Sequence, residues 1–170
     1  MIQWIKKIFG FVHPERITKE QIEQLPPAKL CRQFINGELA SDTECEIFDA
    51  IMCAVELHSE VLNGGFNQYY YNSDGERAEC ARNTFILLGA DRVADVVKHA
   101  NECYATYRSK LHAVWQDETK ESFALGYKEK LFDAFDTEYY ALMRNDKQLY
   151  ELIGTYMKQH PQEFLVNERE

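Results

Sequence analysis

Signals that start and end helices recur along this chain, and they restrict its fold more than any other feature of the sequence. Two segments, beginning at Ser41 and Ser73, have the capping-box spacing in which a glutamate follows a serine three residues later. Between such signals the apolar residues recur at helical spacing, whereas no stretch alternates polar and β-branched residues for long. The sequence therefore predicts an all-α fold, a single-domain compact multi-helix bundle.

The bounds of the expected helices follow from these signals. They comprise a short helix capped by Thr18, a long helix over 41–62, a short one over 66–71, one over 73–89, one beginning at Asp91, helical segments from Thr119 onward, and a last helix capped by Asn145 and ended by Pro161. Residues 1–12 are apolar around Lys6 and Lys7, which predicts a short amphipathic helix rather than a signal peptide. We expect one helical domain over 1–170, with 1–25 as an N-terminal arm.

The composition restricts the function. The chain has 170 residues, which suits one domain, and a formal net charge of −9. The surplus of carboxylates argues against direct binding to nucleic acid or to an anionic membrane, because both demand cations. No apolar run reaches about 18 residues, so no membrane span is expected. The five cysteines include no C-x-x-C pair, which predicts free thiols in a reducing cytoplasm.

The whole acidic surplus lies in one window of the sequence. Residues 33–76 contain neither lysine nor arginine, while the rest of the chain holds acids and bases in equal number. The acids of the window are Glu38, Asp42, Glu44, Glu46, Asp49, Glu56, Glu60, Asp74 and Glu76. A smaller acidic cluster follows at Asp133, Asp136 and Glu138.

The long predicted helix carries its acids on one face. At 100° per residue, five carboxylates lie near one line about 27 Å long, namely Asp42, Glu46, Asp49, Glu56 and Glu60. Cys53 occupies the gap in this line, and the opposite face is apolar. Like charges four residues apart destabilise a helix slightly, so the pattern needs an explanation. Either the acids face a cationic partner, or cations from other segments compensate them, or they serve solubility alone.

No motif for catalysis or for a metal stands out. The sequence lacks H-E-x-x-H, Walker A, Rossmann and G-x-S-x-G patterns, and it lacks Glu-x-x-His pairs around His58 and His99. We therefore expect no enzyme activity, no metal and no cofactor. The alternative is a small-metabolite enzyme or binding protein with a pocket around the Asn63-Gly64-Gly65-Phe66 turn. That pocket would be built from His58, Asn63, Gln68 and Tyr69.

The segment that follows the long helix resembles a known family. From Asn63 to Gly75 the chain reads N-G-G-F-N-Q-Y-Y-Y-N-S-D-G, which is similar to the N-G-G-F-x-Q-Y-x-x-N-x-x-G signature of a family of bacterial helical domains. A looser similarity covers residues 41–110. One member of that family is a bacterial DNA mimic of about this size and acidity. The resemblance implies an all-helical, cytoplasmic homodimer whose target is a helix-turn-helix transcription factor.

The leading hypothesis is accordingly a DNA mimic that blocks operator binding. Asp42, Glu46, Asp49 and Glu56 would form its main stripe, continued by Glu60. The flanking acids would be Glu38, Glu44, Asp74 and Glu76, with Asp133, Asp136 and Glu138 as a second patch. Dimerisation could use the apolar N-terminal helix or the aromatic C-terminal segment. A third hypothesis is an acidic adaptor that binds a basic protein without resembling DNA.

Overall fold

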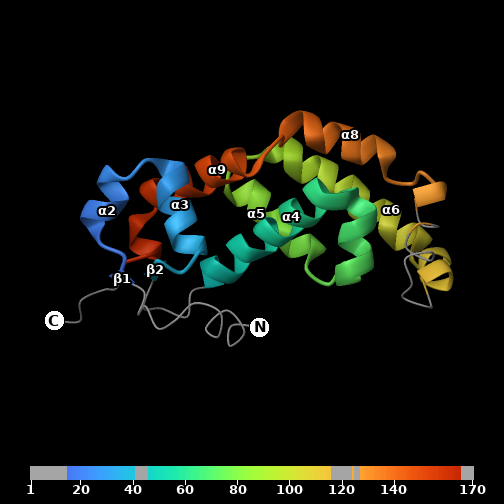
Figure 1. The fold of residues 1–170 in the computed structure, drawn as a ribbon, viewed down its shortest axis with the longest axis horizontal. Helices are drawn as coiled ribbons and strands as arrows, with labels where there is room; N and C mark the ends of the chain where they lie inside the picture. Colours follow the sequence, from blue (N-terminus) through green and yellow to red (C-terminus); the bar gives the residue numbers. More distant parts are fainter. Residues whose placement is uncertain (1–14, 41–45, 116–123, 125–126, 166–170) are drawn as a thin grey trace.

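The fold is all-α, as predicted (Figure 1). The computed structural model describes residues 15–40, 46–115, 124 and 127–165. The helices in these ranges are α2 (Lys19–Gln24), α3 (Pro27–Ile35), α4 (Glu46–Ser73), α5 (Ala78–Leu87), α6 (Asp91–Trp115), α8 (Asp133–Leu142), α9 (Asp146–Gln159) and the short 3-10 helix η1 (Pro161–Glu163). Two short strands, β1 (Glu15–Arg16) and β2 (Leu39–Ala40), pair in parallel.

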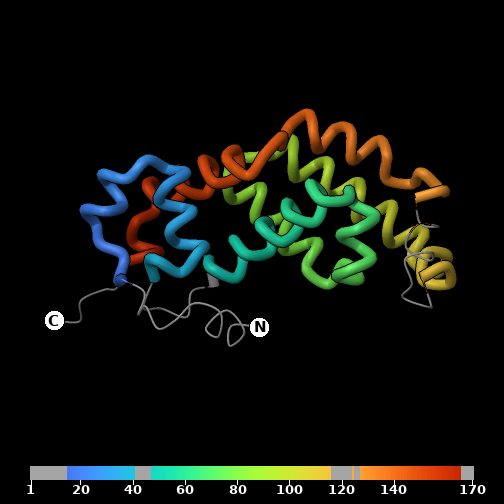
Figure 2. The backbone as a smooth tube through the Cα atoms, in the orientation of Figure 1, coloured from blue at the N-terminus to red at the C-terminus, as the bar shows by residue number. Residues whose placement is uncertain are grey.

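The two ends of the described chain pack together at one end of the elongated molecule. There α2 and α3 lie beside α9, while α4, α5, α6 and α8 form the remainder (Figures 1 and 2). Gly154 permits this packing, because a Cβ at that position would lie 1.9 Å from the backbone oxygen of Pro27. A side chain there would push α9 away from the start of α3.

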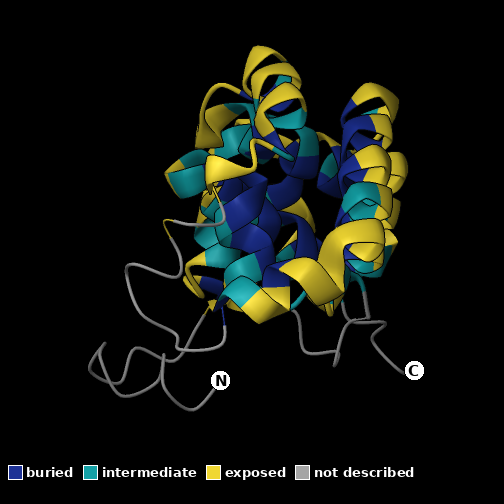
Figure 3. Ribbon diagram, turned by 90° about the vertical axis from the view of Figure 1, so that its right-hand side faces the viewer, coloured by how far each residue is buried: buried dark blue, intermediate teal, exposed yellow. Residues whose placement is uncertain are grey.

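Aromatic side chains build the core where α4, α6 and α8 meet. Tyr70 stacks on Tyr104 of α6 with 4.2 Å between ring centroids, and Phe132 lies 5.1 Å from Tyr70. Phe66 meets Tyr139 of α8 edge to face at 5.6 Å. These aromatic residues are buried. Buried residues as a group lie on the inner sides of the helices (Figure 3). The aromatic part of the N-G-G-F segment therefore serves the core, where paired rings add to the gain from burial.

Several predicted helix ends are confirmed. Thr18 caps α2 with a full capping box, in which its hydroxyl accepts from the Gln21 amide at 3.2 Å and the Gln21 side chain accepts from the Thr18 amide at 2.9 Å. Asn145 precedes α9 at the cap position, although its side chain makes no capping bond, and Pro161 follows the end of α9. The predicted N-terminal helix and the Ser41–Glu44 capping box lie outside the described residues, as do residues 119–123 and 125–126 of the segment predicted to be helical from Thr119 onward. The later part of that segment is helical as predicted, since it forms α8.

The second predicted capping box is wrong. Ser73 ends α4 instead of starting a helix, since its hydroxyl donates to the Tyr69 carbonyl at 2.7 Å and accepts from the Gly75 amide at 3.1 Å. Asp74 and Gly75 then take left-handed φ angles of 52° and 71°, which turn the chain sharply. α5 begins only at Ala78. A serine hydroxyl can satisfy either end of a helix, and the glycine two residues later decides between them.

The expectation of five free thiols is also wrong. A disulfide joins Cys53 of α4 to Cys80 of α5, with 5.9 Å between the Cα atoms. Cys31 and Cys103 are free, and Cys45 lies outside the described residues. Spacing along the sequence could not reveal the pair, because the two cysteines are 27 positions apart and the α4–α5 turn lies between them.

Removing this disulfide should destabilise the protein. Closing a loop of this length lowers the entropy of the unfolded chain enough to stabilise the fold by about 3–4 kcal/mol. We expect a thiol reductant to lower the urea midpoint of the unmodified chain and to leave that of Cys80→Ser unchanged. An unmodified chain whose midpoint does not respond to the reductant would contradict the stabilising role.

Candidate partner-binding surface

A kink divides α4 at the predicted stop. Gly65 has φ 71° and ψ −178°, a conformation essentially reserved for glycine, and Gly64 also departs from helical angles. The helix resumes at once and continues to Ser73, so the segments predicted as 41–62 and 66–71 are two halves of one bent helix. The N-G-G-F motif is thus a bend whose first residue, Asn63, is exposed.

Asp136 of α8 caps the second half of α4. Its Oδ1 accepts from the Phe66 backbone amide at 2.7 Å, the bond that an N-cap side chain would make locally. The carboxylate fits so closely that a Cβ on Gly65 would lie 2.5 Å from Asp136 Oδ2. Burial raises the pKa of Asp136, while the Phe66 amide opposes that shift. Asp136 therefore holds two helices together and is not a free surface carboxylate.

The polar residues of the signature bind across the same bend. Gln68 and Asn72 lie one turn apart after the kink, and their amides donate to Glu60 Oε2 at 2.7 and 2.8 Å. Two tyrosines from later in the chain donate hydrogen bonds to backbone carbonyls at the bend. Tyr127 donates to the Gly64 carbonyl at 2.5 Å, and Tyr140 donates to the Val61 carbonyl at 2.8 Å. Neither tyrosine could be predicted from the sequence, since both are more than 60 residues away from the carbonyls they bind.

The residues of the alternative pocket do not converge. His58 is buried and its Nδ1 lies 3.0 Å from the Tyr139 hydroxyl, whereas Asn63 is exposed. Gln68 is bound to Glu60, and burial raises the pKa of Tyr69 to about 12. The groove found in the described part of the chain lies elsewhere, between the end of α5 and α9. None of the four residues proposed for the metabolite pocket lines this groove.

The predicted anionic stripe on α4 is interrupted by α5. Cys53 is buried under α5 by the disulfide, and the half-buried Glu56 pairs with Arg77 at 3.4 Å. Arg77 also donates to the backbone oxygen of Asp49 at 2.9 Å. The expectation of a continuous uncompensated stripe is therefore wrong at Glu56. Arg77 is the first basic residue after the base-free window 33–76. Its position at the end of that window was the one sequence feature that could have suggested it as the partner of Glu56.

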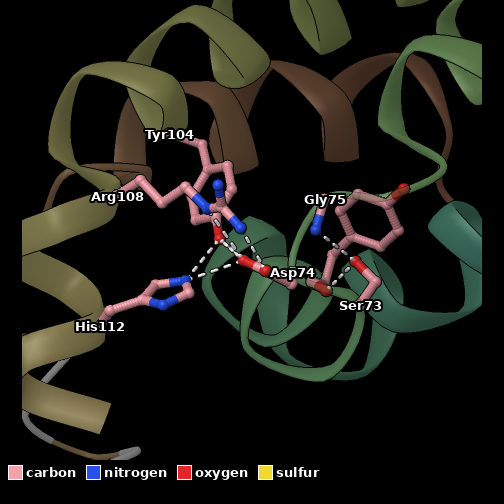
Figure 4. Close-up of polar contacts among 7 residues, drawn as sticks. Ser73, Asp74, Gly75, Tyr104, Arg108 and His112 are labelled. Atoms are coloured by element: carbon pink, nitrogen blue, oxygen red, sulfur yellow. Dashed lines mark hydrogen bonds and ion pairs between the residues drawn. The ribbon is translucent and has the colours of Figure 1, made fainter. Parts of the chain in front are cut away.

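Asp74 is compensated as well (Figure 4). Its carboxylate accepts from the guanidinium of Arg108, from the hydroxyl of Tyr104 and from His112 Nε2, the last at 2.8 Å. The Arg108 guanidinium is the main reason that the pKa of Asp74 lies well below its usual range. Tyr104, Arg108 and His112 follow one another at intervals of four along α6. Asp74 thus ties the α4–α5 turn to α6, and that spacing could have identified its partners.

Four predicted acids remain exposed with neither an ion pair nor a side-chain hydrogen bond among the described residues. They are Asp49, Glu76, Asp133 and Glu138. Glu38 is exposed near β2 and accepts from the Gln33 amide at 3.1 Å. Glu46 is the first residue of α4, and its side chain is not among the described atoms. Asp42 and Glu44 lie outside the described residues. The four exposed acids, which we call the open acids, are the part of the predicted surface that is free to meet a partner.

The described residues provide neither a metal site nor a helix that could cross a membrane. No group of histidine, cysteine and carboxylate side chains is arranged to hold a metal ion there. Among the helices of those ranges, none combines the length and apolar character that a membrane crossing requires.

Comparisons with known proteins place most of the chain in one family. The family model described as DMP19-like protein matches residues 45–160, which include both halves of α4, the kink and its partners from α8. Neither the curated proteins nor the solved structures gave a match.

Gly65→Ala should strongly destabilise the fold. A Cβ at this position meets the Asp136 carboxylate and forces an unfavourable φ angle, so we expect a loss of about 3 kcal/mol in the free energy of unfolding. Gly89→Ala is the matched control, because Gly89 has the same φ of 71° but nothing within 4 Å of its Cβ position. Strain alone should cost about 1 kcal/mol there. Equal losses in urea denaturation would contradict the close fit of Asp136.

His58 should make the stability depend on pH. Burial lowers its pKa below the usual value, opposed by the nearby Asp146 carboxylate and the Asn145 backbone. The unfolded chain then binds a proton more readily than the folded one. Stability is therefore complete above the unfolded pKa of about 6.5 and falls as pH drops through the folded value. The free energy of unfolding by urea should differ less between pH 7.5 and pH 5.0 for His58→Gln than for the unmodified chain. An identical difference would contradict this assignment.

Proposed function

We infer a DNA-mimic function from the fact that this chain belongs to the DMP19-like protein family. We propose that it is a non-enzymatic inhibitor, acting in the cytoplasm, that binds the DNA-binding surface of a helix-turn-helix transcription factor. The family match over residues 45–160 is the observation that carries the proposal. The net charge of −9 supports it, as does the presence of exposed acids that have no ion pair within the described ranges.

The open acids are the candidate phosphate substitutes. Asp49 lies on the first half of α4 and Glu76 lies in the turn before α5, whereas Asp133 and Glu138 lie on α8. Lysines and arginines that contact DNA phosphates would contact these carboxylates instead. Asp42, Glu44 and Glu46 extend the same acidic segment toward the N-terminus, so they belong to the proposed surface on the ground of sequence alone.

The proposed mechanism is competition. A surface of one sign steers a cationic partner electrostatically, so the complex should form quickly and weaken as salt rises. Helix-turn-helix regulators are commonly dimers whose recognition helices contact half-sites about 34 Å apart. We propose a two-fold homodimer of this chain, since it would offer two acidic surfaces to such a regulator. Glu56, Asp74 and Asp136 are excluded from direct mimicry because they are committed to Arg77, Arg108 and the Phe66 amide, respectively.

Neutralising the open acids should abolish the competition. The variant Asp49→Asn/Glu76→Gln/Asp133→Asn/Glu138→Gln removes four exposed charges that form neither an ion pair nor a side-chain hydrogen bond among the described residues, so folding should be retained. The matched control is Glu15→Gln/Glu23→Gln/Asp95→Asn/Glu102→Gln, which changes the net charge equally at other exposed positions. The regulator is first recovered by capture on the unmodified chain at low salt and elution with a salt gradient.

A gel shift with that regulator and its operator then measures displacement of DNA. We expect the first variant to need at least about tenfold more protein than the unmodified chain, and the control variant to compete nearly normally. Equal competition by both variants would remove the open acids from the mimic surface. A ternary complex of chain, regulator and operator would instead support an acidic adaptor.

A further inference from the structure

A groove of about 870 Å³ lies between the C-terminal end of α5 and one face of α9. Its apolar lining includes Leu87 and Val93 on one side and Leu142 and Leu152 on the other. Leu87 is 44% exposed, which is unusual for a leucine beside other apolar side chains. The lining on α9 runs from Lys147 to Gln159, about 18 Å at the helical rise. The groove is therefore long enough for about three turns of a helix.

The charge of the groove is opposite to that of the molecule. Arg144 and Lys147 line one end of it, both are exposed, and neither has an ion pair among the described residues. Glu151 is the acidic residue of the lining. The N-terminus of α9 lies at the same end and adds the positive end of its dipole. A chain with nine excess acids thus has a basic end on its apolar groove.

We propose that this groove binds a short amphipathic helix of a partner protein, one with an apolar face and acidic residues at its C-terminal end. The apolar face would cover Leu87, Leu142 and Leu152, as in other helix-in-groove complexes. The helix lies antiparallel to α9, since its negative C-terminal end then meets Arg144, Lys147 and the start of α9. None of the open acids lines this groove.

Synthetic peptides test the proposal with the full-length chain. The probe is a fluorescently labelled helical peptide of about twelve residues, with leucines at i, i+3, i+4 and i+7 spacing and glutamates in its last turn. The comparison peptide carries lysines in place of those glutamates. Fluorescence anisotropy should show saturable binding of the acidic peptide, weakened by salt, and at least about tenfold weaker binding of the basic one.

Two variants locate the binding. Leu87→Asp and Lys147→Glu alter exposed positions, so they should unfold at the same temperature as the unmodified chain, and each should weaken the acidic peptide at least about tenfold. Lys128→Glu, which changes the charge equally outside the groove, should bind normally. The proposal is overturned if neither peptide binds, if both bind equally, or if the groove variants bind like the unmodified chain.

The oligomeric state distinguishes a partner helix in the groove from a second copy of this chain. If Leu87→Asp converts a dimer of the unmodified chain into a monomer in analytical ultracentrifugation, the groove is an interface between two copies and the partner-helix assignment is wrong. An unchanged oligomeric state together with loss of peptide binding supports the proposal. The operator competition of the preceding section is expected to be unaffected by Leu87→Asp, so failure of one proposal leaves the other open.

Discussion

The arrangement of α4 against α8 depends on a single backbone amide, that of Phe66. The bend at Gly64 and Gly65 interrupts the helical hydrogen bonds of α4, and a buried amide left without a partner would cost about 1–3 kcal/mol. Asp136 of α8 accepts from this amide at 2.7 Å. The same contact brings Phe66 against Tyr139 and fixes the direction of the second half of α4. The aromatic core between α4, α6 and α8 can form only with α8 in this place.

Among the described residues, the carboxylates predicted to bind a partner have two different roles. Glu60, Asp74 and Asp136 bind amides, a guanidinium or hydroxyls of the same chain and hold turns in place. The open acids make no such bonds among the described residues and remain available to another molecule. The net charge of −9 therefore includes acids that are bound within the chain and are not available to a cationic partner. The function proposed for the chain depends on the second group alone.

The sequence predicted the fold class and the position of the bend, because capping signals and a glycine pair act locally. The capping box of Thr18 and the stop at Asn63-Gly64-Gly65 needed no information from distant residues. The error at Ser73 arose locally too, since one hydroxyl can serve either end of a helix and Gly75 decides the outcome.

The site was less predictable, because its determinants are distant in the sequence. The helical wheel of α4 placed Asp49, Cys53 and Glu56 on one face correctly, yet it could not show that α5 covers that face. The roles of Arg77, Arg108 and Tyr127 likewise depend on tertiary contacts. Helix periodicity tells which residues share a side of one helix, but only packing tells whether that side meets solvent, a cation or another helix.

The central claim is that exposed carboxylates of this chain occupy the surface that a regulator uses for DNA. Chemical-shift mapping of the isotopically labelled chain with its captured regulator tests it most directly. The account predicts that the regulator shifts the amide signals around Asp49, Glu76, Asp133 and Glu138, and that added operator DNA returns them to their free positions. Signals that stay shifted in the presence of saturating operator, or shifts confined to other surfaces, would contradict it.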